Sequence, residues 1–173
     1  MALPTPQGAP YRVSMVCLGN ICRSPMAAAV MQSKVEHAGL ADDVAIDSAG
    51  TGSWHVGDRA DPRARAALAR RGYDGESHRA RQFSSTWFDS YDLILAMDHD
   101  NLRTLRRLAP DDSAAGRVML LRQFDADASD ADDQLVPDPY YGDERDFETG
   151  LDIIERSVDG LVSALSQRLA QAP

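Results

Sequence analysis

The stretch Arg-Val-Ser-Met-Val-Cys-Leu-Gly-Asn-Ile-Cys-Arg-Ser-Pro, residues 12–25, decides the fold of this chain. Residues 12–17 are rich in apolar and β-branched side chains, which is typical of a buried first strand. After a brief polar loop, Ser24 stands at the expected helix cap, Pro25 in the first turn and Gly39 after an alanine-rich segment. The stretch therefore predicts a strand, a short loop and a helix.

The rest of the chain continues this alternation. We expect further strands at residues 44–47, 91–97 and 118–121, and further helices at residues 62–71, 101–108 and 147–169. Residues 124–146 show no periodicity. Alternating strands and helices predict an α/β domain with a parallel sheet and helices on both faces. In such folds ligands bind at the carboxyl ends of the strands.

Size and charge narrow the possible functions. The chain has 173 residues, which predicts one domain at residues 12–173 after a disordered, proline-containing lead-in at residues 1–11. A net charge of −9 argues against a nucleic-acid-binding protein. No segment resembles a signal peptide or a membrane-spanning helix, so we expect a cytoplasmic protein with no membrane partner.

The loop between the first strand and the first helix carries the candidate chemistry. Its backbone N–H groups and the dipole of the helix favour an anion, and the same field stabilises a thiolate at Cys17. Cys17 is therefore a candidate nucleophile. The planar fork of Arg23 suits two phosphoryl oxygens, and Ser24 can donate a hydrogen bond to the thiolate. A phosphate-binding loop after the first strand is the resulting prediction.

Four segments resemble motifs of the low-molecular-weight protein tyrosine phosphatases of the bacterial type, in the same order. They are residues 16–27, 47–57, 78–82 and 138–142, beginning Val-Cys-Leu-Gly-Asn-Ile-Cys-Arg-Ser and ending Asp-Pro-Tyr-Tyr-Gly. The resemblance implies a four-stranded parallel sheet and hydrolysis of phosphotyrosine through a phosphocysteine intermediate. It gives Cys17 the role of nucleophile, Arg23 that of phosphate clamp and Asp138 that of general acid and base.

The resemblance also implies supporting residues in the loop. Asn20 matches a position held in a left-handed conformation, which asparagine tolerates better than most residues. Ser48 and His78 resemble its hydrogen-bonding supports, and Ser24 completes this group. For His78 we expect a structural role without proton transfer.

Substrate contacts are expected from apolar and aromatic residues around the loop. They are Leu18, Gly19, Ile21, Cys22, Trp54, Tyr140 and Tyr141. Trp54 and the tyrosines are candidates for a wall against the substrate ring, although aromatic side chains are more often part of the core. Ile21 favours phosphotyrosine, because the related arginine phosphatases have threonine at this position. The expected partner is a phosphotyrosine-containing protein, with inorganic phosphate as product and no cofactor.

Three alternatives remain open at this stage. A thiol-coupled arsenate reductase would need only Cys17, a protein arginine phosphatase would use a similar loop, and an inactive module would bind phosphotyrosine without cleaving it. Metal sites are not expected: Asp130 and Val136 break the calcium-loop pattern of the acidic segment, and Cys17, Cys22 and His55 lack a fourth zinc ligand.

Cys22 is also a candidate for redox regulation. It lies five residues after Cys17 in a loop that curls around one anion, and a nearby thiol can capture an oxidised thiolate as a disulfide. The alternative is a small buried hydrophobic residue behind the loop.

Overall fold

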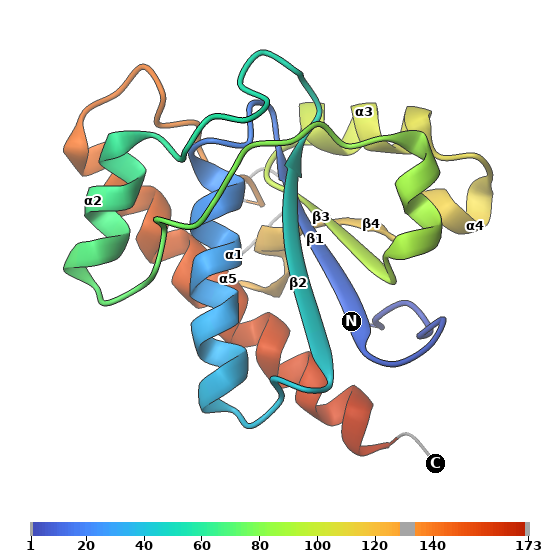
Figure 1. Ribbon diagram of the computed structural model, residues 1–173. Coiled ribbons are helices and arrows are strands. Elements are labelled where there is room, and N and C mark those ends of the chain that lie inside the picture. Colours follow the sequence, from blue (N-terminus) through green and yellow to red (C-terminus); the bar gives the residue numbers. More distant parts are fainter. Residues whose placement is uncertain (1, 129–133, 172–173) are drawn as a thin grey trace.

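The structure is a computed structural model that describes residues 2–128 and 134–171. Its centre is a parallel sheet with the strand order β2-β1-β3-β4. The strands are β1 (Tyr11–Cys17), β2 (Val44–Gly50), β3 (Leu93–Ala96) and β4 (Val118–Leu120). All the paired strands run in the same direction, so their carboxyl ends meet at one edge of the sheet (Figure 1).

Helices cover both faces of this sheet, as the alternating pattern predicts. One side carries α1 (Arg23–His37), α2 (Pro62–Arg70) and α5 (Glu144–Ala170), and the other carries η1 (Ser85–Ser90), α3 (His99–Leu108) and α4 (Asp112–Ala115) (Figure 1). A short 3₁₀ turn, η2 (Leu121–Phe124), follows β4. The α/β fold class is thereby confirmed.

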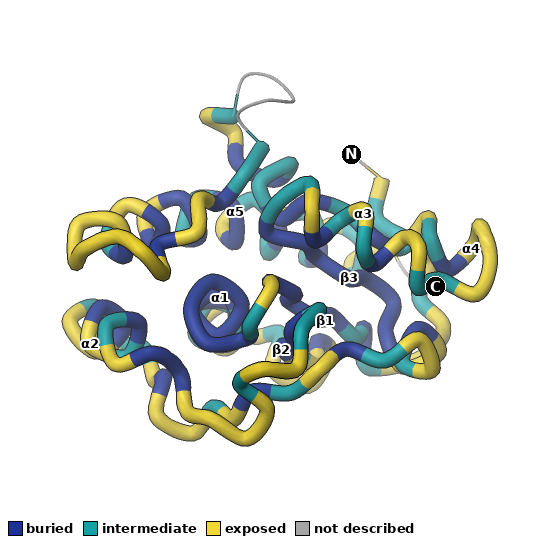
Figure 2. The backbone as a smooth tube through the Cα atoms, turned by 90° about the horizontal axis from the view of Figure 1, so that it is seen from above, coloured by how far each residue is buried: buried dark blue, intermediate teal, exposed yellow. Residues whose placement is uncertain are grey.

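The core has two parts because successive side chains of a strand point to opposite faces. From β1, Val13 and Met15 join the cluster under α1 and α5, whereas Val16 joins the cluster that contains Phe88 and Leu105. Figure 2 shows α1 as a buried ring between α2, α5 and the sheet. Its small residues, such as Ala27, allow this close enclosure.

Some helices begin at residues other than those that the sequence predicts. Ser24 was expected to cap α1, and this prediction is wrong: the N-cap is Cys22, which makes no side-chain capping bond. Asp61 caps α2, which begins at Pro62 as the sequence predicts. The last helix starts earlier than residue 147, because Asp143 and Asp146 form a reciprocal capping box.

The lead-in carries no helix or strand at residues 2–10, yet it makes specific contacts. The backbone N–H of Gln7 donates to Asp92 Oδ1 at 2.6 Å, and the Tyr11 hydroxyl donates to the Pro4 carbonyl at 3.0 Å. Some residues of this segment thus have hydrogen-bond partners elsewhere in the chain, and the disorder of residues 1–11 stays a prediction from composition. Of the acidic segment, Asp130, Asp132 and Asp133 lie outside the described residues.

In the described part of the chain, none of the helices combines the length and the apolar character needed to cross a membrane.

Candidate active site

The loop between β1 and α1 is held against the end of β2. Thr51 N–H donates to the Cys17 carbonyl at 2.9 Å, and Gly52 N–H donates to the Leu18 carbonyl at 2.9 Å. A Cβ atom on Gly50 would lie 2.7 Å from the Leu18 carbonyl oxygen. Position 50 therefore requires glycine, since any side chain would push the loop away from the sheet.

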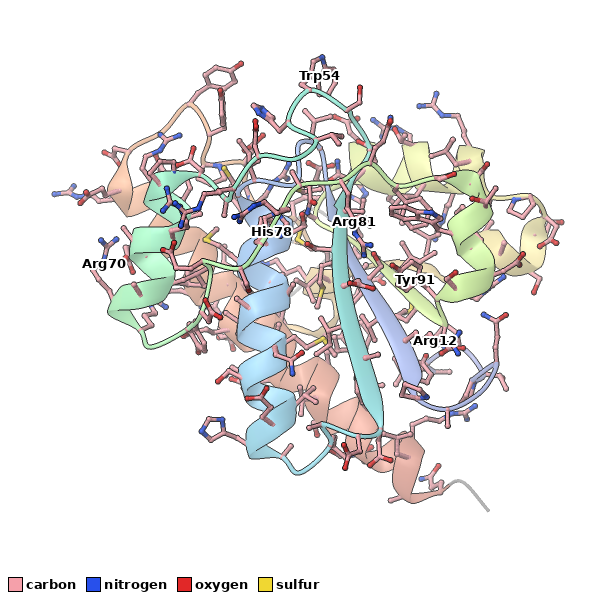
Figure 3. All side chains as sticks on the ribbon, viewed as in Figure 1. Arg12, Trp54, Arg70, His78, Arg81 and Tyr91 are labelled. Atoms are coloured by element: carbon pink, nitrogen blue, oxygen red, sulfur yellow. The ribbon has the colours of Figure 1, made fainter. Side chains whose placement is uncertain are left out.

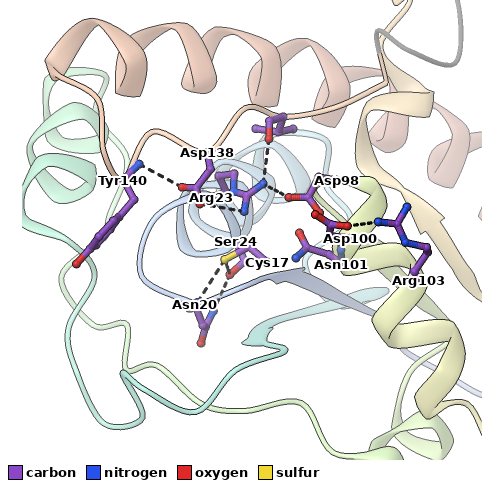
Figure 4. A network of polar contacts seen from close by, with 11 residues as sticks. Cys17, Asn20, Arg23, Ser24, Asp98, Asp100, Asn101, Arg103, Asp138 and Tyr140 are labelled. Atoms are coloured by element: carbon purple, nitrogen blue, oxygen red, sulfur yellow. Dashed lines mark hydrogen bonds and ion pairs between the residues drawn. The ribbon is translucent and has the colours of Figure 1, made fainter.

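The thiol of Cys17 lies inside this loop, at the carboxyl end of β1. Its Sγ atom is 3.0 Å from the Ser24 hydroxyl and accepts a bond from the Asn20 N–H at 3.3 Å (Figure 4). The Ser24 hydroxyl is thus used at the sulfur, which explains why it does not cap the helix. The Asn20 N–H thus donates to the sulfur, and the Ser24 hydroxyl lies at hydrogen-bond distance from it.

Asn20 organises the loop through an unusual backbone conformation and a full set of hydrogen bonds. Its φ angle is 57°, in the left-handed region that the resemblance implied. Its amide nitrogen donates to the hydroxyls of Ser24 at 2.8 Å and Ser48 at 3.0 Å. The backbone N–H of Arg81 donates to the Asn20 side-chain oxygen at 2.9 Å. These partners come from three separate segments and fix one loop geometry.

His78 supports the same residue from the other side. Its Nε2 atom is 2.7 Å from the backbone carbonyl of Asn20, so this nitrogen carries the hydrogen and donates. Burial lowers the pKa of His78, and the charges of Arg79 and Arg81 lower it further against the opposing effect of the Asn20 carbonyl. His78 is therefore neutral at neutral pH. Figure 3 shows His78 and Arg81 on the segment that crosses in front of α1 and β2.

Arg23 is held with its guanidinium at the mouth of the loop. The side chain is only 3% exposed, and Nη1 donates to Asp98 Oδ2 at 2.6 Å and to the Val136 carbonyl at 3.1 Å. Burial opposes the charge, but Cys17 and the nearby carboxylates more than offset it and raise the pKa of Arg23. The guanidinium stays charged and pre-positioned.

Asp98 is a site residue that the sequence reasoning missed. It caps α3 through the Asn101 N–H at 2.8 Å while its other oxygen binds Arg23. An aspartate directly after a buried central strand and before a helix is a signal that could have indicated it.

Asp138 reaches the site from the long segment before α5. One carboxylate oxygen lies 3.6 Å from Arg23 Nη2, and the other accepts the Tyr140 N–H at 3.1 Å (Figure 4). The side chain is 44% exposed, so water and substrate can reach it. The candidate acid is therefore within reach of the loop around Cys17.

Cys17, Arg23 and Asp138 line one pocket of 310 Å³. The pocket walls contain every substrate-contact residue expected from the sequence: Leu18, Gly19, Ile21, Cys22, Trp54, Tyr140 and Tyr141. They also contain His55, which was not expected there. Trp54 is 73% exposed and Tyr141 95% exposed, so both stand at the rim, outside the core. The Tyr140 and Tyr141 rings meet edge to face at 4.9 Å. The rim can enclose a planar aromatic group.

Cys22 lines the same pocket from a buried position. Burial raises its pKa, and the negative charges of Asp61 and Cys17 raise it further. At neutral pH Cys22 is therefore a thiol.

Comparison with known proteins points to one family. The family model described as "Low molecular weight phosphotyrosine protein phosphatase" matches residues 12–171. A low-molecular-weight protein-tyrosine-phosphatase of Streptomyces coelicolor is 52% identical over 92% of this chain and 96% of its own length. Phosphatase A of Mycobacterium tuberculosis is 44% identical over 94% of this chain and 96% of its own. A crystal structure of a protein tyrosine phosphatase from Entamoeba histolytica matches with a TM-score of 0.85 at 37% identity, covering 91% of this chain and 98% of that one.

Proposed function

Since the chain belongs to the low-molecular-weight phosphotyrosine protein phosphatase family, we propose that it hydrolyses phosphotyrosine in other proteins with Cys17 as nucleophile. One observation carries the proposal: a sulfur that accepts the Asn20 N–H and lies 3.0 Å from the Ser24 hydroxyl lines the same 310 Å³ pocket as Arg23 and Asp138. A nucleophile, a phosphate clamp and an acid are the groups that a two-step phosphoryl transfer needs.

In the first step the Cys17 thiolate attacks phosphorus, and the bond from phosphorus to the tyrosyl oxygen breaks. Asp138 gives its proton to the departing phenolate, which leaves as tyrosine. Arg23 neutralises charge on the transferred phosphoryl oxygens, and Asp98 keeps the guanidinium in place. The product of this step is a phosphocysteine.

In the second step Asp138 removes a proton from a water molecule, and the oxygen of that water attacks phosphorus. The bond from sulfur to phosphorus breaks and inorganic phosphate is released. Ser24 donates a hydrogen bond to the sulfur as it regains its negative charge. The backbone N–H of Asn20 stabilises the same charge, which makes the thiolate a better leaving group.

The pocket wall favours an aromatic substrate. Ile21 lines the pocket with an apolar side chain, and Trp54 and Tyr140 flank its opening. A phenyl ring gains apolar contact there, whereas a phosphoarginine guanidinium would lose hydration without a polar partner at position 21. Phosphotyrosine is therefore preferred over phosphoarginine.

The test compares wild type with Cys17→Ser on an aryl phosphate and on a phosphotyrosyl peptide. Wild type should release phosphate without added metal, and Cys17→Ser should bind the peptide while losing essentially all turnover, because Arg23 and the backbone donors remain. Residual activity of the variant within about tenfold of wild type would contradict a cysteine nucleophile. Parallel assays with phosphoarginine and with arsenate plus thiol test the arginine phosphatase and arsenate reductase activities. If wild type shows no turnover in any assay, the protein is a module that binds phosphotyrosine without cleaving it.

A further inference from the structure

The segment that presents Asp138 is exposed and irregular. Residues 137–143 contain no helix or strand, and most of them are exposed. A general acid must nevertheless meet the leaving oxygen at hydrogen-bond distance. Some contact has to hold this segment at the pocket.

Arg63, in the first turn of α2, makes that contact. Its Nη2 donates to the Tyr140 carbonyl at 2.9 Å and its Nη1 donates to the Gly142 carbonyl at 3.1 Å. The backbone of residues 137–143 makes hydrogen bonds with the side chain of Arg63. In the described part of the chain, no other side chain from outside residues 136–146 bonds this backbone. The guanidinium also lies over the Phe147 ring, 4.6 Å from its centroid, where α5 begins.

Arg63 is itself fixed by Asp61. The Nε and Nη2 atoms of Arg63 donate to the two carboxylate oxygens at 3.1 and 2.9 Å. The hydrogen bonds of this pair overcome the effect of burial and lower the pKa of Asp61, so the pair is charged at neutral pH. The backbone N–H of Asp61 donates to the Ile21 carbonyl at 2.8 Å, inside the loop around Cys17. The Asp61–Arg63 pair thus contacts the loop around Cys17 on one side. On the other side it contacts residues 137–143, the acid segment.

We propose that Arg63 is a positioning residue for general acid catalysis, which holds the Asp138 segment in register with the Cys17 loop. The inference rests on the proposed function of Asp138. Arg63 acts through the backbone of the segment and does not touch the phosphoryl group. Its loss should therefore impair protonation of the leaving group and spare the binding of phosphate.

The experiment uses phenyl phosphate, whose phenolate departs poorly without a proton, and p-nitrophenyl phosphate, whose phenolate departs readily. General acid catalysis contributes about 10²–10⁴-fold, so Arg63→Ala should lower kcat/KM, which reports the first step alone, by about tenfold on phenyl phosphate and by less than about threefold on p-nitrophenyl phosphate. In an Asp138→Asn background, Arg63→Ala should cause less than about a twofold further loss of kcat/KM, because Arg63 acts only through Asp138.

Two further variants separate positioning from folding. Arg63→Lys keeps a positive charge beside Asp61 but lacks the fork that reaches two carbonyls, so it should fold and show the same selective loss. Arg70→Ala removes a contact between α2 and Glu148 of α5, away from the acid segment, and should leave the ratio of the two substrates unchanged. Inhibition by inorganic phosphate should stay within about twofold of wild type in Arg63→Ala, Arg63→Lys and Arg70→Ala, since the donors around Cys17 remain.

Equal losses of kcat/KM on both substrates, or independent losses in the double variant, would overturn the inference. A large change in phosphate inhibition would overturn it too, because Arg63 would then act on the anion in the pocket. These results differ from a failure of the proposed function, in which wild type and Arg70→Ala would turn over neither substrate.

Discussion

At the residue scale, the orientation of Arg23 depends on a carboxylate from another element, the N-cap residue of α3. Asp98 Oδ2 lies 2.6 Å from the buried guanidinium, and the second oxygen of Asp98 caps α3. The direction of the Arg23 fork is therefore set by the carboxyl end of β3. A rigid fork loses less freedom when it binds a phosphoryl group in the transition state.

Asp98→Asn should test this dependence. Asparagine can still cap α3, but the charge-assisted bond to Arg23, worth about 1.5–3 kcal/mol, is lost. We expect kcat on an aryl phosphate to fall about 10- to 100-fold, with a smaller change in KM because removal of a negative charge also eases phosphate binding. Asp100→Asn is the matched control, since Asp100 is exposed and pairs with Arg103 on the same helix. Equal kcat values in the two variants would refute the anchoring role.

The two cysteines should respond differently to peroxide. A thiolate is oxidised and a thiol is not, and burial raises the pKa of Cys22, so Cys17 is the site of attack. Peroxide converts Cys17 to a sulfenic acid, and the Cys22 thiol then forms a disulfide with release of water. Wild type should regain almost full activity with excess thiol, whereas Cys22→Ser should lose a fraction permanently. Identical recovery would leave Cys22 as a buried hydrophobic residue.

Local rules predict residues that act near their own position in the chain. Residues that act across the fold, such as His78 and Asp138, were expected only from the family resemblance, and two others were missed. Cys17, Asn20 and Arg23 lie within one strand-loop-helix stretch whose geometry follows from local rules. Asp98 acts on a residue 75 positions away, and Arg63 acts on a carbonyl 77 positions away. Only tertiary packing reveals such pairs. Of the two roles expected for Ser24, the cap is wrong, because the helix begins at Arg23, whereas its hydroxyl does lie 3.0 Å from the Cys17 sulfur.

At the element scale, α5 spans most of the molecule and closes the sheet face that carries α1 (Figure 1). The sequence predicted its periodic, apolar part. Its first turn could not be predicted from hydrophobic spacing, because it depends on the Asp143 and Asp146 capping box. Two glycines lie inside this helix, in different surroundings.

Alanine substitution of these glycines should change stability in opposite directions. A Cβ atom on Gly150 would meet nothing within 4 Å, so Gly150→Ala should raise the free energy of unfolding by about 0.5–1 kcal/mol. A Cβ atom on Gly160 would lie 1.9 Å from the Phe124 carbonyl oxygen, so Gly160→Ala should lower it by about 1–3 kcal/mol. Urea unfolding of both variants measures the effects. Changes of the same sign would contradict the packing of η2 on α5.

At the scale of the whole molecule, the site exists only where distant segments meet at one edge of the sheet. The segments at residues 16–27, 47–57, 78–82 and 138–142 each contribute to the Cys17 loop or its pocket. Their order in the sequence indicated a family, and the parallel sheet explains why they converge. Global stability and the geometry of the site are consequently linked through contacts such as the one between His78 and Asn20.

This link predicts a dependence of stability on pH. Because burial lowers the pKa of folded His78, the unfolded chain, with a histidine pKa of about 6.5, binds more protons as the pH falls. The contribution of His78 to stability is therefore present above about pH 6.5 and is lost as the pH falls through the folded pKa. His78→Gln does not titrate and can still donate to the Asn20 carbonyl. The free energies of unfolding of wild type and variant are measured from about pH 7.5 down to about pH 5. As the pH falls, the free energy of unfolding of wild type should fall more than that of the variant. If the two free energies of unfolding change in parallel with pH, His78 is protonated equally in the folded and unfolded states. The neutral Nε2–H donor assigned to the Asn20 carbonyl would then be wrong.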